Sequence, residues 1–355
     1  MSRIRVLHLS RGREWRGGER QVCLLARTQR AGHEVDPTVL TAGGSALATA
    51  LIPAAVPTLP VPWRWALDPR AAWAALGAVR AWQRAAPGPA LLHAHDSHAL
   101  QLGLLLARLG RLPLVATRRS DTPAGALWRR AGRVIALSPA VQRRLLVAGV
   151  AGDRVAVVPT AVDLEALMQR PTPPGPPGPD LVAVGALTPE KGQATLLDAF
   201  ALVARRIPAA RLTILGDGPE RAALAERAAR LGLTAAVTWL GEVPDATGWI
   251  RGAALLVHPS RREALGTAVL EAMALGVPVV ASATGGLVDL LGDDHGRLVP
   301  PGDPVALSAA ILDLLAAPET AARLARRARE RVREHDAARV AARTAAVYRS
   351  ALIQP

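Results

Sequence analysis

Short apolar runs alternate with longer amphipathic segments along almost the whole chain of 355 residues. Runs of four to six residues rich in Val, Leu and Ala have the length and composition of buried β-strands. Segments with helical spacing separate them, among them 190–206, 219–231 and 267–275. A strand followed by a helix, repeated many times, predicts a parallel sheet covered by helices on both faces. The predicted strands lie at 6–10, 35–40, 91–94, 114–117, 133–137, 155–158, 181–184, 211–215, 237–240, 254–258 and 277–281.

One segment interrupts this alternation. Residues 171–180 contain six prolines and two glycines, which excludes a helix interior or a central strand and predicts an extended linker. The chain then divides into a first α/β domain at 1–170 and a second at 181–335, both Rossmann-like. The Ala- and Arg-rich segment 318–352 predicts two helices, and the last, at 336–355, can pack back on the first domain. Ligands of such sheets bind at the carboxyl ends of the strands.

The composition narrows the class of protein. Half of the residues are hydrophobic and a fifth are charged, as in globular proteins with large cores, which excludes wholesale disorder. The one cysteine, Cys23, excludes an intramolecular disulfide framework and fits a reducing cytoplasm. No targeting segment stands out at the N-terminus. The uncharged stretch 37–63 contains five prolines, so it is not expected to form a membrane-spanning helix.

The net charge of +14 is concentrated in the first half of the chain. Residues 1–170 hold 23 basic and 10 acidic residues (net +13), and the remainder holds 20 and 19 (net +1). Because all basic residues but one are arginine, their abundance alone is weak support for any partner. Their uneven distribution predicts an anionic partner for the first half, either nucleic acid, acidic lipid or a phosphorylated small molecule. No nucleic-acid-binding module is present, so we expect no nucleic acid.

Candidate chemistry is clearest at 258–281, which follows the order strand, loop, helix, strand. Glu263 precedes the helix, and Glu271 lies inside it among apolar neighbours. A carboxylate in that setting is costly unless it meets a hydrogen-bond donor, and sugar or ribose hydroxyls are suitable donors. Gly266 and Thr267, at the start of the helix, offer backbone N–H groups and a positive dipole end to a phosphate.

Glu263 and Glu271, with seven residues between them and Ala-Met-Ala-Leu-Gly-Val-Pro-Val-Val after them, resemble the signature of the retaining GT-B glycosyltransferases of family 4. Other segments agree with this resemblance. Residues 184–192 resemble the phosphate-binding loop of that family, 215–221 its nucleotide-side loop, 16–20 its N-terminal glycine loop and 93–96 its acceptor-side strand end. The resemblance covers nearly the whole chain and preserves the order of the motifs.

The resemblance implies a GT-B fold, in which two Rossmann-like domains with parallel sheets face each other across a cleft. It also implies a metal-independent enzyme of the hexosyltransferase type that works with retention and without a cofactor. A UDP-, GDP- or ADP-linked sugar would be held mainly by the second domain. A cell-envelope or other glycoconjugate acceptor, including a lipid-linked one, would be held mainly by the first. The absence of an Asp-x-Asp motif agrees with metal independence.

The same resemblance assigns roles to individual residues. Lys191, the only lysine, would neutralise the diphosphate; Glu263 would accept hydroxyls of the transferred sugar; His95 would orient the donor or acceptor. Further donor contacts would come from Gly17, Gly18, Gly216, Leu265, Gly266, Thr267 and Glu271, and the acceptor-side candidates are Asp96, Arg118 and Arg119.

A metal site at His93, His95 and His98 is the alternative interpretation of these histidines. We disfavour it because His93 and His95 share one face of a predicted buried strand.

Two departures from the family pattern leave the donor open. Ala186 stands where the family commonly has arginine, so that a cationic contact must come from elsewhere, for example from Arg261 or Arg262. Ala264-Leu265 replaces the usual Gly-Phe, which alters the wall around the sugar. Glucose, mannose, heptose and N-acetylhexosamine therefore all stay open. A non-catalytic nucleotide-sugar sensor and, with less support, a basic nucleic-acid-binding protein are the alternatives from other functional classes.

Tryptophans and arginines are interleaved in the first half of the chain. One interpretation is core tryptophan beside solvated arginine. The other is a surface for anionic lipid, which would place the enzyme peripherally on the cytoplasmic face of the membrane. The six tryptophans concerned are Trp15, Trp63, Trp65, Trp73, Trp82 and Trp128.

Overall fold

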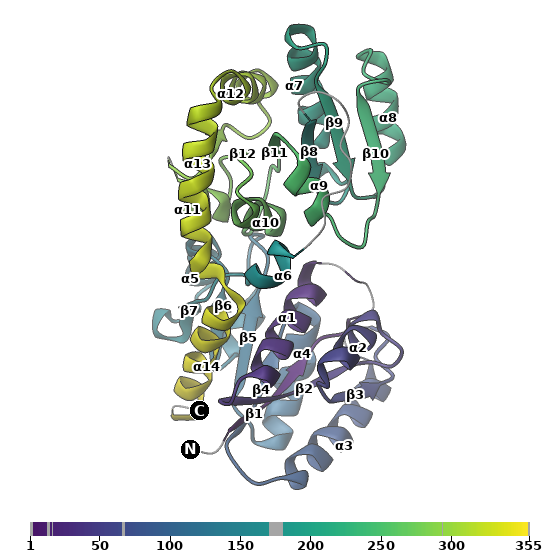
Figure 1. Ribbon diagram of the computed structural model, residues 1–355. Coiled ribbons are helices and arrows are strands. Elements are labelled where there is room, and N and C mark those ends of the chain that lie inside the picture. Colours follow the sequence, from purple (N-terminus) through teal and green to yellow (C-terminus); the bar gives the residue numbers. More distant parts are fainter. Residues whose placement is uncertain are drawn as a thin grey trace. The chain divides into compact units, whose positions relative to one another are not determined.

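The computed structural model describes residues 3–12, 15, 17–65, 68–169, 180–292 and 294–353. The chain forms two compact units (Figure 1). Unit 1 consists of Met1–Ala161 and His335–Pro355, and unit 2 consists of Val162–Glu334. Each unit is built around one parallel sheet.

Unit 1 contains a seven-stranded sheet in the order β3-β2-β1-β4-β5-β6-β7, with all pairs parallel. Its strands are β1 Ile4–Leu9, β2 Val35–Ala42, β3 Thr58–Val61, β4 Ala90–Ala94, β5 Leu114–Arg118, β6 Arg133–Ala136 and β7 Val155–Val157. Its α-helices are α1 Gly17–Ala31, α2 Ala46–Leu51, α3 Pro69–Ala85, α4 Ser97–Gly110, α5 Pro139–Val147 and α14 Ala337–Ile353.

Unit 2 contains a six-stranded parallel sheet in the order β10-β9-β8-β11-β12-β13. Its strands are β8 Asp180–Val184, β9 Arg211–Leu215, β10 Val237–Gly241, β11 Leu255–His258, β12 Val279–Ser282 and β13 Arg297–Val299. Its α-helices are α6 Leu164–Met168, α7 Gln193–Arg206, α8 Arg221–Arg230, α9 Thr247–Gly252, α10 Thr267–Leu275, α11 Gly286–Leu291, α12 Pro304–Ala316 and α13 Pro318–Arg331. The chain also forms 3₁₀ turns: η1 Ile52–Ala54, η2 Ala126–Arg130, η3 Gly152–Arg154, η4 Pro189–Lys191 and η5 Val332–His335.

Each sheet has one position where the strand order reverses. In unit 1 it lies between β1 and β4, and in unit 2 between β8 and β11. The loops that leave two such strands diverge to opposite faces of the sheet, and the crevice beyond their carboxyl ends is where ligands of open α/β sheets bind. The fold therefore offers one candidate site in each unit.

The structure corrects the sequence prediction at both sheets. The strands β3 and β13 were not predicted, and both lie at sheet edges. Pro60 within β3 obscures the strand pattern, yet an edge strand tolerates proline because one side of it needs no ladder hydrogen bonds. Asp180, assigned to the linker, is the buried first residue of β8; residues 171–179 of the linker lie outside the described residues.

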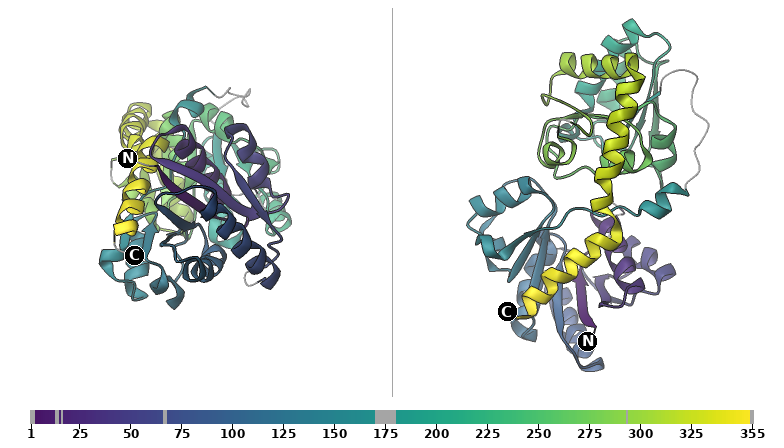
Figure 2. Two further views of the ribbon diagram at one scale, coloured as in Figure 1. Left: turned by 90° about the horizontal axis from the view of Figure 1, so that it is seen from below. Right: turned by 60° about the vertical axis from the view of Figure 1, so that its left-hand side comes forward.

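The unit boundary also differs from the predicted one at residue 170. Helix α6 belongs to unit 2 because Leu167 is buried in its core beside α10. Helix α14 returns to unit 1, where it contacts α1, β4, β5 and β6 (Figure 2). Among the described residues no single helix is long and apolar enough to span a membrane; α12 and α13 reach that length only as a pair bent by 101°.

Candidate functional site

In unit 2 the loops that follow β8 and β11 bring Lys191 and Glu263 together. The Lys191 ammonium donates a hydrogen bond of 2.7 Å from Nζ to Glu263 Oε2, and His258 Nε2 lies 2.9 Å from the same oxygen. The second oxygen, Oε1, accepts from the backbone N–H of Ala264 at 3.1 Å. The carboxylate is thus fixed in orientation at the switch point of the sheet.

Its surroundings keep Glu263 ionised. Burial alone raises the pKa of Glu263, but the hydrogen bond and charge of His258, together with the Lys191 ammonium, hold that pKa well below its usual value. The Lys191 side chain keeps 26% of its surface exposed, so a ligand can reach this side chain. A fixed carboxylate next to an accessible ammonium can bind hydroxyls and an anion side by side.

Two glycines allow these loops to approach so closely. A Cβ atom on Gly192, whose φ is +71°, would lie 2.1 Å from the carbonyl oxygen of Pro259. A Cβ atom on Gly216, with φ +128°, would lie 2.0 Å from the carbonyl oxygen of Gly185. Both positions exclude any side chain on steric and conformational grounds. The loops after β8, β9 and β11 are therefore packed backbone against backbone, which fixes the position of Lys191.

The helix α10 begins directly beside Glu263. Gly266 is its N-cap, with φ +88° and no side-chain cap, so the first N–H groups of the helix have no side-chain acceptor within the cap. Leu265 and Gly266 are buried, and Thr267 is half-buried. Glu271 follows one turn later and is half-buried between fully buried neighbours. The structure thus places Glu263, Gly266, Thr267 and Glu271 on one loop and the first turns of one helix.

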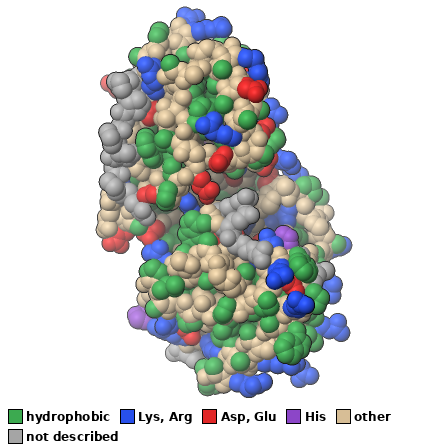
Figure 3. Space-filling model, turned by 90° about the vertical axis from the view of Figure 1, so that its right-hand side faces the viewer, with side chains coloured by type: hydrophobic (Ala, Val, Ile, Leu, Met, Phe, Trp, Pro, Cys, Tyr) green, Lys and Arg blue, Asp and Glu red, His purple; other side chains and the backbone are tan. Residues whose placement is uncertain are grey.

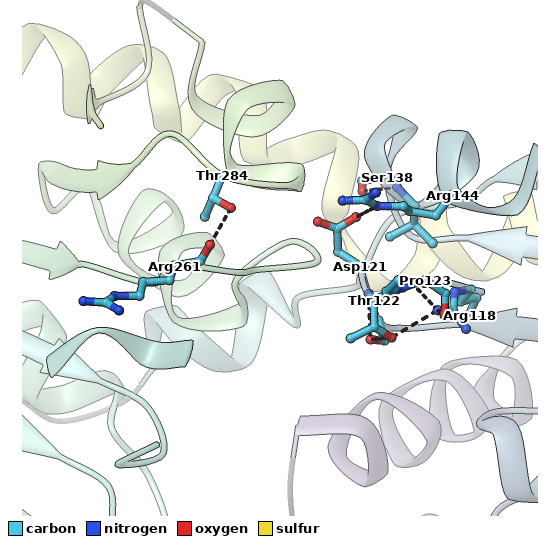
Figure 4. Close-up of polar contacts among 10 residues, drawn as sticks. Arg118, Asp121, Thr122, Pro123, Ser138, Arg144, Arg261 and Thr284 are labelled. Atoms are coloured by element: carbon cyan, nitrogen blue, oxygen red, sulfur yellow. Dashed lines mark hydrogen bonds and ion pairs between the residues drawn. The ribbon is translucent and has the colours of Figure 1, made fainter. Parts of the chain in front are cut away.

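Neither Arg261 nor Arg262 is placed by its contacts to supply the cationic contact that an arginine at position 186 would make. Ala186, Arg261 and Arg262 are all exposed. The backbone carbonyl of Arg261 accepts a hydrogen bond of 3.0 Å from Thr284 Oγ1, while its side chain extends away from that contact (Figure 4). The backbone N–H of Arg261 donates to the Glu190 carbonyl at 2.8 Å. Arg261 therefore holds the loops together through its backbone and leaves its guanidinium at the surface.

In unit 1 a pocket of about 240 Å³ lies at the carboxyl ends of β1, β4 and β5. Four predicted acceptor-side or catalytic residues line it, together with Gly18 of the N-terminal glycine pair. A Cβ atom on Gly17 or Gly18 would meet open space, so packing within the protein does not require glycine there. The lining residues are Ser10, Gly18, Glu19, Val22, His95, Asp96, Ser97, Thr117, Arg118, Arg119, Ser120 and Trp128.

Two of these residues already make structural contacts. Asp96 is the N-cap of α4 and accepts from the Ala99 N–H at 2.7 Å. Arg118 is buried, and its Nη2 donates to Thr122 and Pro123 (Figure 4). Its guanidinium lies 5.1 Å from the centre of the Trp128 ring. Both side chains shape the pocket wall by fixing the loops beside it.

His95 is buried in the floor of this pocket with both ring nitrogens engaged. Its Nε2 lies 2.8 Å from His8 Nδ1, and its Nδ1 lies 3.2 Å from Arg119 Nη2. In this arrangement neither nitrogen is available to a sugar hydroxyl.

Nitrogens of three buried histidines lie within 4.8 Å of one another, but they are His8, His93 and His95. His98 is exposed and outside the cluster, so the metal alternative named the wrong third residue. Sequence reasoning missed His8, although a histidine in the apolar run of β1 is itself an unusual signal. Each histidine of the cluster hydrogen-bonds to protein partners, and Arg119 adds positive charge beside them. In this structure the three histidines are joined in one hydrogen-bonded network.

Comparison with known proteins agrees with this arrangement. The model of Glycosyltransferase Family 4 matches residues 15–166, and that of Glycosyl transferases group 1 matches residues 169–331. A phosphatidyl-myo-inositol mannosyltransferase of Mycolicibacterium smegmatis is 31% identical over 274 residues, which cover 73% of this chain and 70% of the relative. The chain belongs to glycosyltransferase family 4.

Other relatives of this family-4 glycosyltransferase extend the similarity. A D-inositol 3-phosphate glycosyltransferase of Streptomyces coelicolor is 30% identical over 333 residues, covering 78% of this chain and 72% of the relative. The crystal structure of HepE from Anabaena, in complex with UDP and glucose, superposes with a TM-score of 0.84 at 24% identity and covers 97% of this chain and 99% of that one. The fold of the family-4 chain is GT-B, as the sequence predicted.

Proposed function

We propose that this family-4 glycosyltransferase moves a hexose-type sugar from a nucleotide sugar to a glycoconjugate acceptor with retention of anomeric configuration. The observation that carries the proposal is the Glu263 carboxylate, held ionised by Lys191 and His258 beside the glycine-capped start of α10. This arrangement suits a ligand that carries hydroxyls at one end and a diphosphate at the other. A protein solved with UDP and glucose shares the fold.

In the proposed reaction, unit 2 binds the donor. The Lys191 ammonium and the first N–H groups of α10 face the diphosphate, Glu263 accepts sugar hydroxyls, and Glu271 accepts ribose hydroxyls. The bond between the anomeric carbon and the leaving oxygen breaks, the acceptor oxygen bonds to the same face of the sugar, and the leaving phosphate oxygen takes the acceptor proton. The protein positions both reactants and stabilises the charge that develops on the diphosphate, without a metal or cofactor.

The acceptor is proposed to bind in the pocket of unit 1. Serine and threonine hydroxyls and the Arg119 guanidinium give this pocket donors for a polar, anionic acceptor. Two relatives act on inositol compounds, one of them D-inositol 3-phosphate, by their names. We infer that the acceptor is a polyol or glycoconjugate that carries phosphate, either free or linked to lipid.

A thermal-shift screen of nucleotide sugars tests the donor proposal. The preferred donor among UDP-, GDP- and ADP-linked sugars should raise the melting temperature by several degrees, because a ligand at 100 times its Kd stabilises the folded state by about 2.7 kcal/mol. The same compound should be consumed in the presence of acceptor. Stabilisation without consumption would indicate a nucleotide-sugar sensor, and no stabilisation by any compound would contradict the donor site.

A second part of the proposal concerns where the enzyme works. Of the six tryptophans in the first half, Trp63, Trp82 and Trp128 are buried, as the core interpretation requires. Trp65 and Trp73 are different, with 57% and 82% of their surface exposed.

Arg70, Trp73, Arg80 and Arg84 are exposed along α3 at spacings that place them on one side of the helix. Asp68 is the one acidic residue between 64 and 85, and it is buried as the N-cap of α3. On the visible face of unit 1, basic and hydrophobic side chains are interspersed (Figure 3). We infer that this surface contacts anionic lipid, with indole rings at the interface and arginines at the headgroups, and that the enzyme works at the cytoplasmic leaflet.

Vesicle flotation measures this contact. The protein should float with vesicles of phosphatidylcholine and phosphatidylglycerol at low salt, and much less with phosphatidylcholine alone, because arginines near a surface contribute about 1 kcal/mol each. The double variant Arg80→Glu/Arg84→Glu should abolish flotation. Arg205→Glu/Arg206→Glu, an equal charge change at exposed residues of unit 2, is the control and should float normally. Equal loss in both variants would mean that net charge, not this surface, attracts the vesicles.

A further inference from the structure

A set of polar side chains crosses the core of unit 1 beneath the pocket. They come from five elements, β1, α1, β4, β5 and α14, and from the residues that directly follow β4 and β5. All but Arg119 are at most 3% exposed, and Tyr348 is fully buried. Of this set, the proposed reaction uses Arg119 only. The set consists of His8, Gln29, His93, His95, Thr117, Arg119 and Tyr348.

The direction of the hydrogen bonds in this set follows from one residue. A guanidinium only donates, so the contact of 3.2 Å between Arg119 Nη2 and His95 makes His95 Nδ1 an acceptor. In a neutral ring, Nε2 then carries the proton and donates to His8 Nδ1 at 2.8 Å. The same rule makes His8 Nε2 a donor, and it meets Gln29 Oε1 at 2.8 Å. Reversing any one of these bonds would set two donors against each other.

The second half of the set continues in the same direction. Because Gln29 accepts through Oε1, its NH₂ group donates to the Tyr348 oxygen at 3.4 Å. The Tyr348 oxygen accepts from Gln29 and still has its single proton, which we assign to a hydrogen bond donated to His93 Nδ1 at 2.7 Å. His93 Nε2 consequently carries a proton and donates to Thr117 Oγ1 at 2.7 Å. Arg119 thus fixes the states of His95, His8 and Gln29, and continuing the same direction through Tyr348 assigns His93 the same Nε2–H tautomer.

We propose that Tyr348, Gln29 and His8 are positioning residues that hold His95 as the neutral Nε2–H tautomer, so that its Nδ1 accepts from Arg119 and orients the guanidinium in the pocket. The Nε atom of Arg119 is buried and has no hydrogen-bond partner among the residues that the structure describes. The chain of hydrogen bonds therefore ends in one fixed cation with an N–H group to spare. Through Tyr348, helix α14 therefore helps to build the pocket of unit 1, whose first lining residue is Ser10.

The electrostatics agree with three neutral rings. Burial, with a smaller contribution from the Arg119 charge, lowers the pKa of His8 to about 4 even though the hydrogen bond to Gln29 opposes the shift. Burial also lowers the pKa of His93 and of His95 well below the usual value, and neighbouring histidines and Arg119 lower them further. Burial lowers the pKa of Arg119 to about 10, which leaves it protonated at neutral pH. The charge of the network thus resides on Arg119.

The consequence for catalysis rests on the proposed function: an oriented Arg119 would bind the anionic group of the acceptor. The existence of the network does not rest on it. A test that needs no substrate therefore separates the two proposals.

Nitrogen spectra of the full chain labelled with ¹⁵N-histidine and ¹⁵N-arginine provide that test. At neutral pH His8, His93 and His95 should each show the Nε2–H tautomer, with signals assigned by single His→Asn variants. Tyr348→Phe removes the proton donor of His93 and the acceptor of the Gln29 amide. It should shift the ring signals of His93 and His8 and the Arg119 Nε–H signal.

Thr344→Val is the matched control. Thr344 is a buried hydroxyl one turn earlier on α14, and it donates to the Val340 carbonyl of the same helix. Its loss should leave all three histidine tautomers and the Arg119 signal unchanged. A protonated ring, an Nδ1–H tautomer at any of the three positions, or equal spectral changes in both variants would overturn the proposal. If Tyr348→Phe fails to fold, Gln29→Met should likewise shift the His8 ring signals and the Arg119 Nε–H signal.

Discussion

Replacing Glu263 by Gln should lower the rate of sugar transfer by at least about tenfold while unit 2 stays folded. The amide keeps the shape and an acceptor oxygen for Lys191 and His258, but it loses the negative charge that both groups hold in place. Sugar hydroxyls then meet a weaker acceptor, and Lys191 loses the partner that directs it. Initial rates at saturating donor and acceptor, beside the melting temperature of each protein, measure the effect.

Glu226→Gln is the control for this change. Glu226 has 74% of its side chain exposed on α8, so the same chemical substitution there should leave the rate within about twofold. Lys191→Ala should behave like Glu263→Gln, because it removes the cation proposed to bind the diphosphate. A folded Glu263→Gln protein with an unaltered rate would contradict the role assigned to the carboxylate.

Sequence patterns predict most of the fold because buried parallel strands and capped helices leave local signals. Helix α10 was predicted at its observed bounds, since Gly266 and Gly276 flank an apolar segment and both take positive φ values. The edge strand β3 was missed because prolines mask its pattern. The boundary between the units depends on which hydrophobic core the short helix α6 joins, and the sequence of α6 does not indicate which core that is.

The site residues also fall into two groups, those that sequence motifs indicate and those that only the structure shows. Lys191 and Glu263 lie in motifs that a family resemblance identifies, and the structure brings them to hydrogen-bond distance across 72 positions of sequence. His258 also ends an apolar run, but the sequence indicates no role for it, and only the structure shows its ring beside Glu263. Tyr348 meets His93 across 255 positions. The sequence predicts that the last helix can pack back on the first domain, but no local pattern indicates that Tyr348 meets His93 there.

The close packing of the unit 2 loops predicts a large effect on stability for a substitution at Gly192. Gly192 ends η4 and precedes α7, and its φ is +71°. Gly232, between α8 and β10, has nearly the same φ, +72°, but a Cβ atom there would meet open space. The two glycines share the conformational cost of a side chain and differ in the steric one. They therefore separate backbone preference from loop packing.

Gly192→Ala should destabilise unit 2 by at least about 3 kcal/mol, because the left-handed conformation costs about 1–2 kcal/mol and a Cβ atom 2.1 Å from the Pro259 carbonyl oxygen forces two backbones apart. Gly232→Ala should cost only the conformational part. Denaturant unfolding of both variants gives the comparison. Movement of the Pro259 loop would also shift Glu263 away from Lys191, so Gly192→Ala should lose the stabilisation by the preferred nucleotide sugar, which Gly232→Ala should keep. Similar losses of stability in the two variants would mean that the loops after β8 and β11 are not packed as closely as the donor site requires.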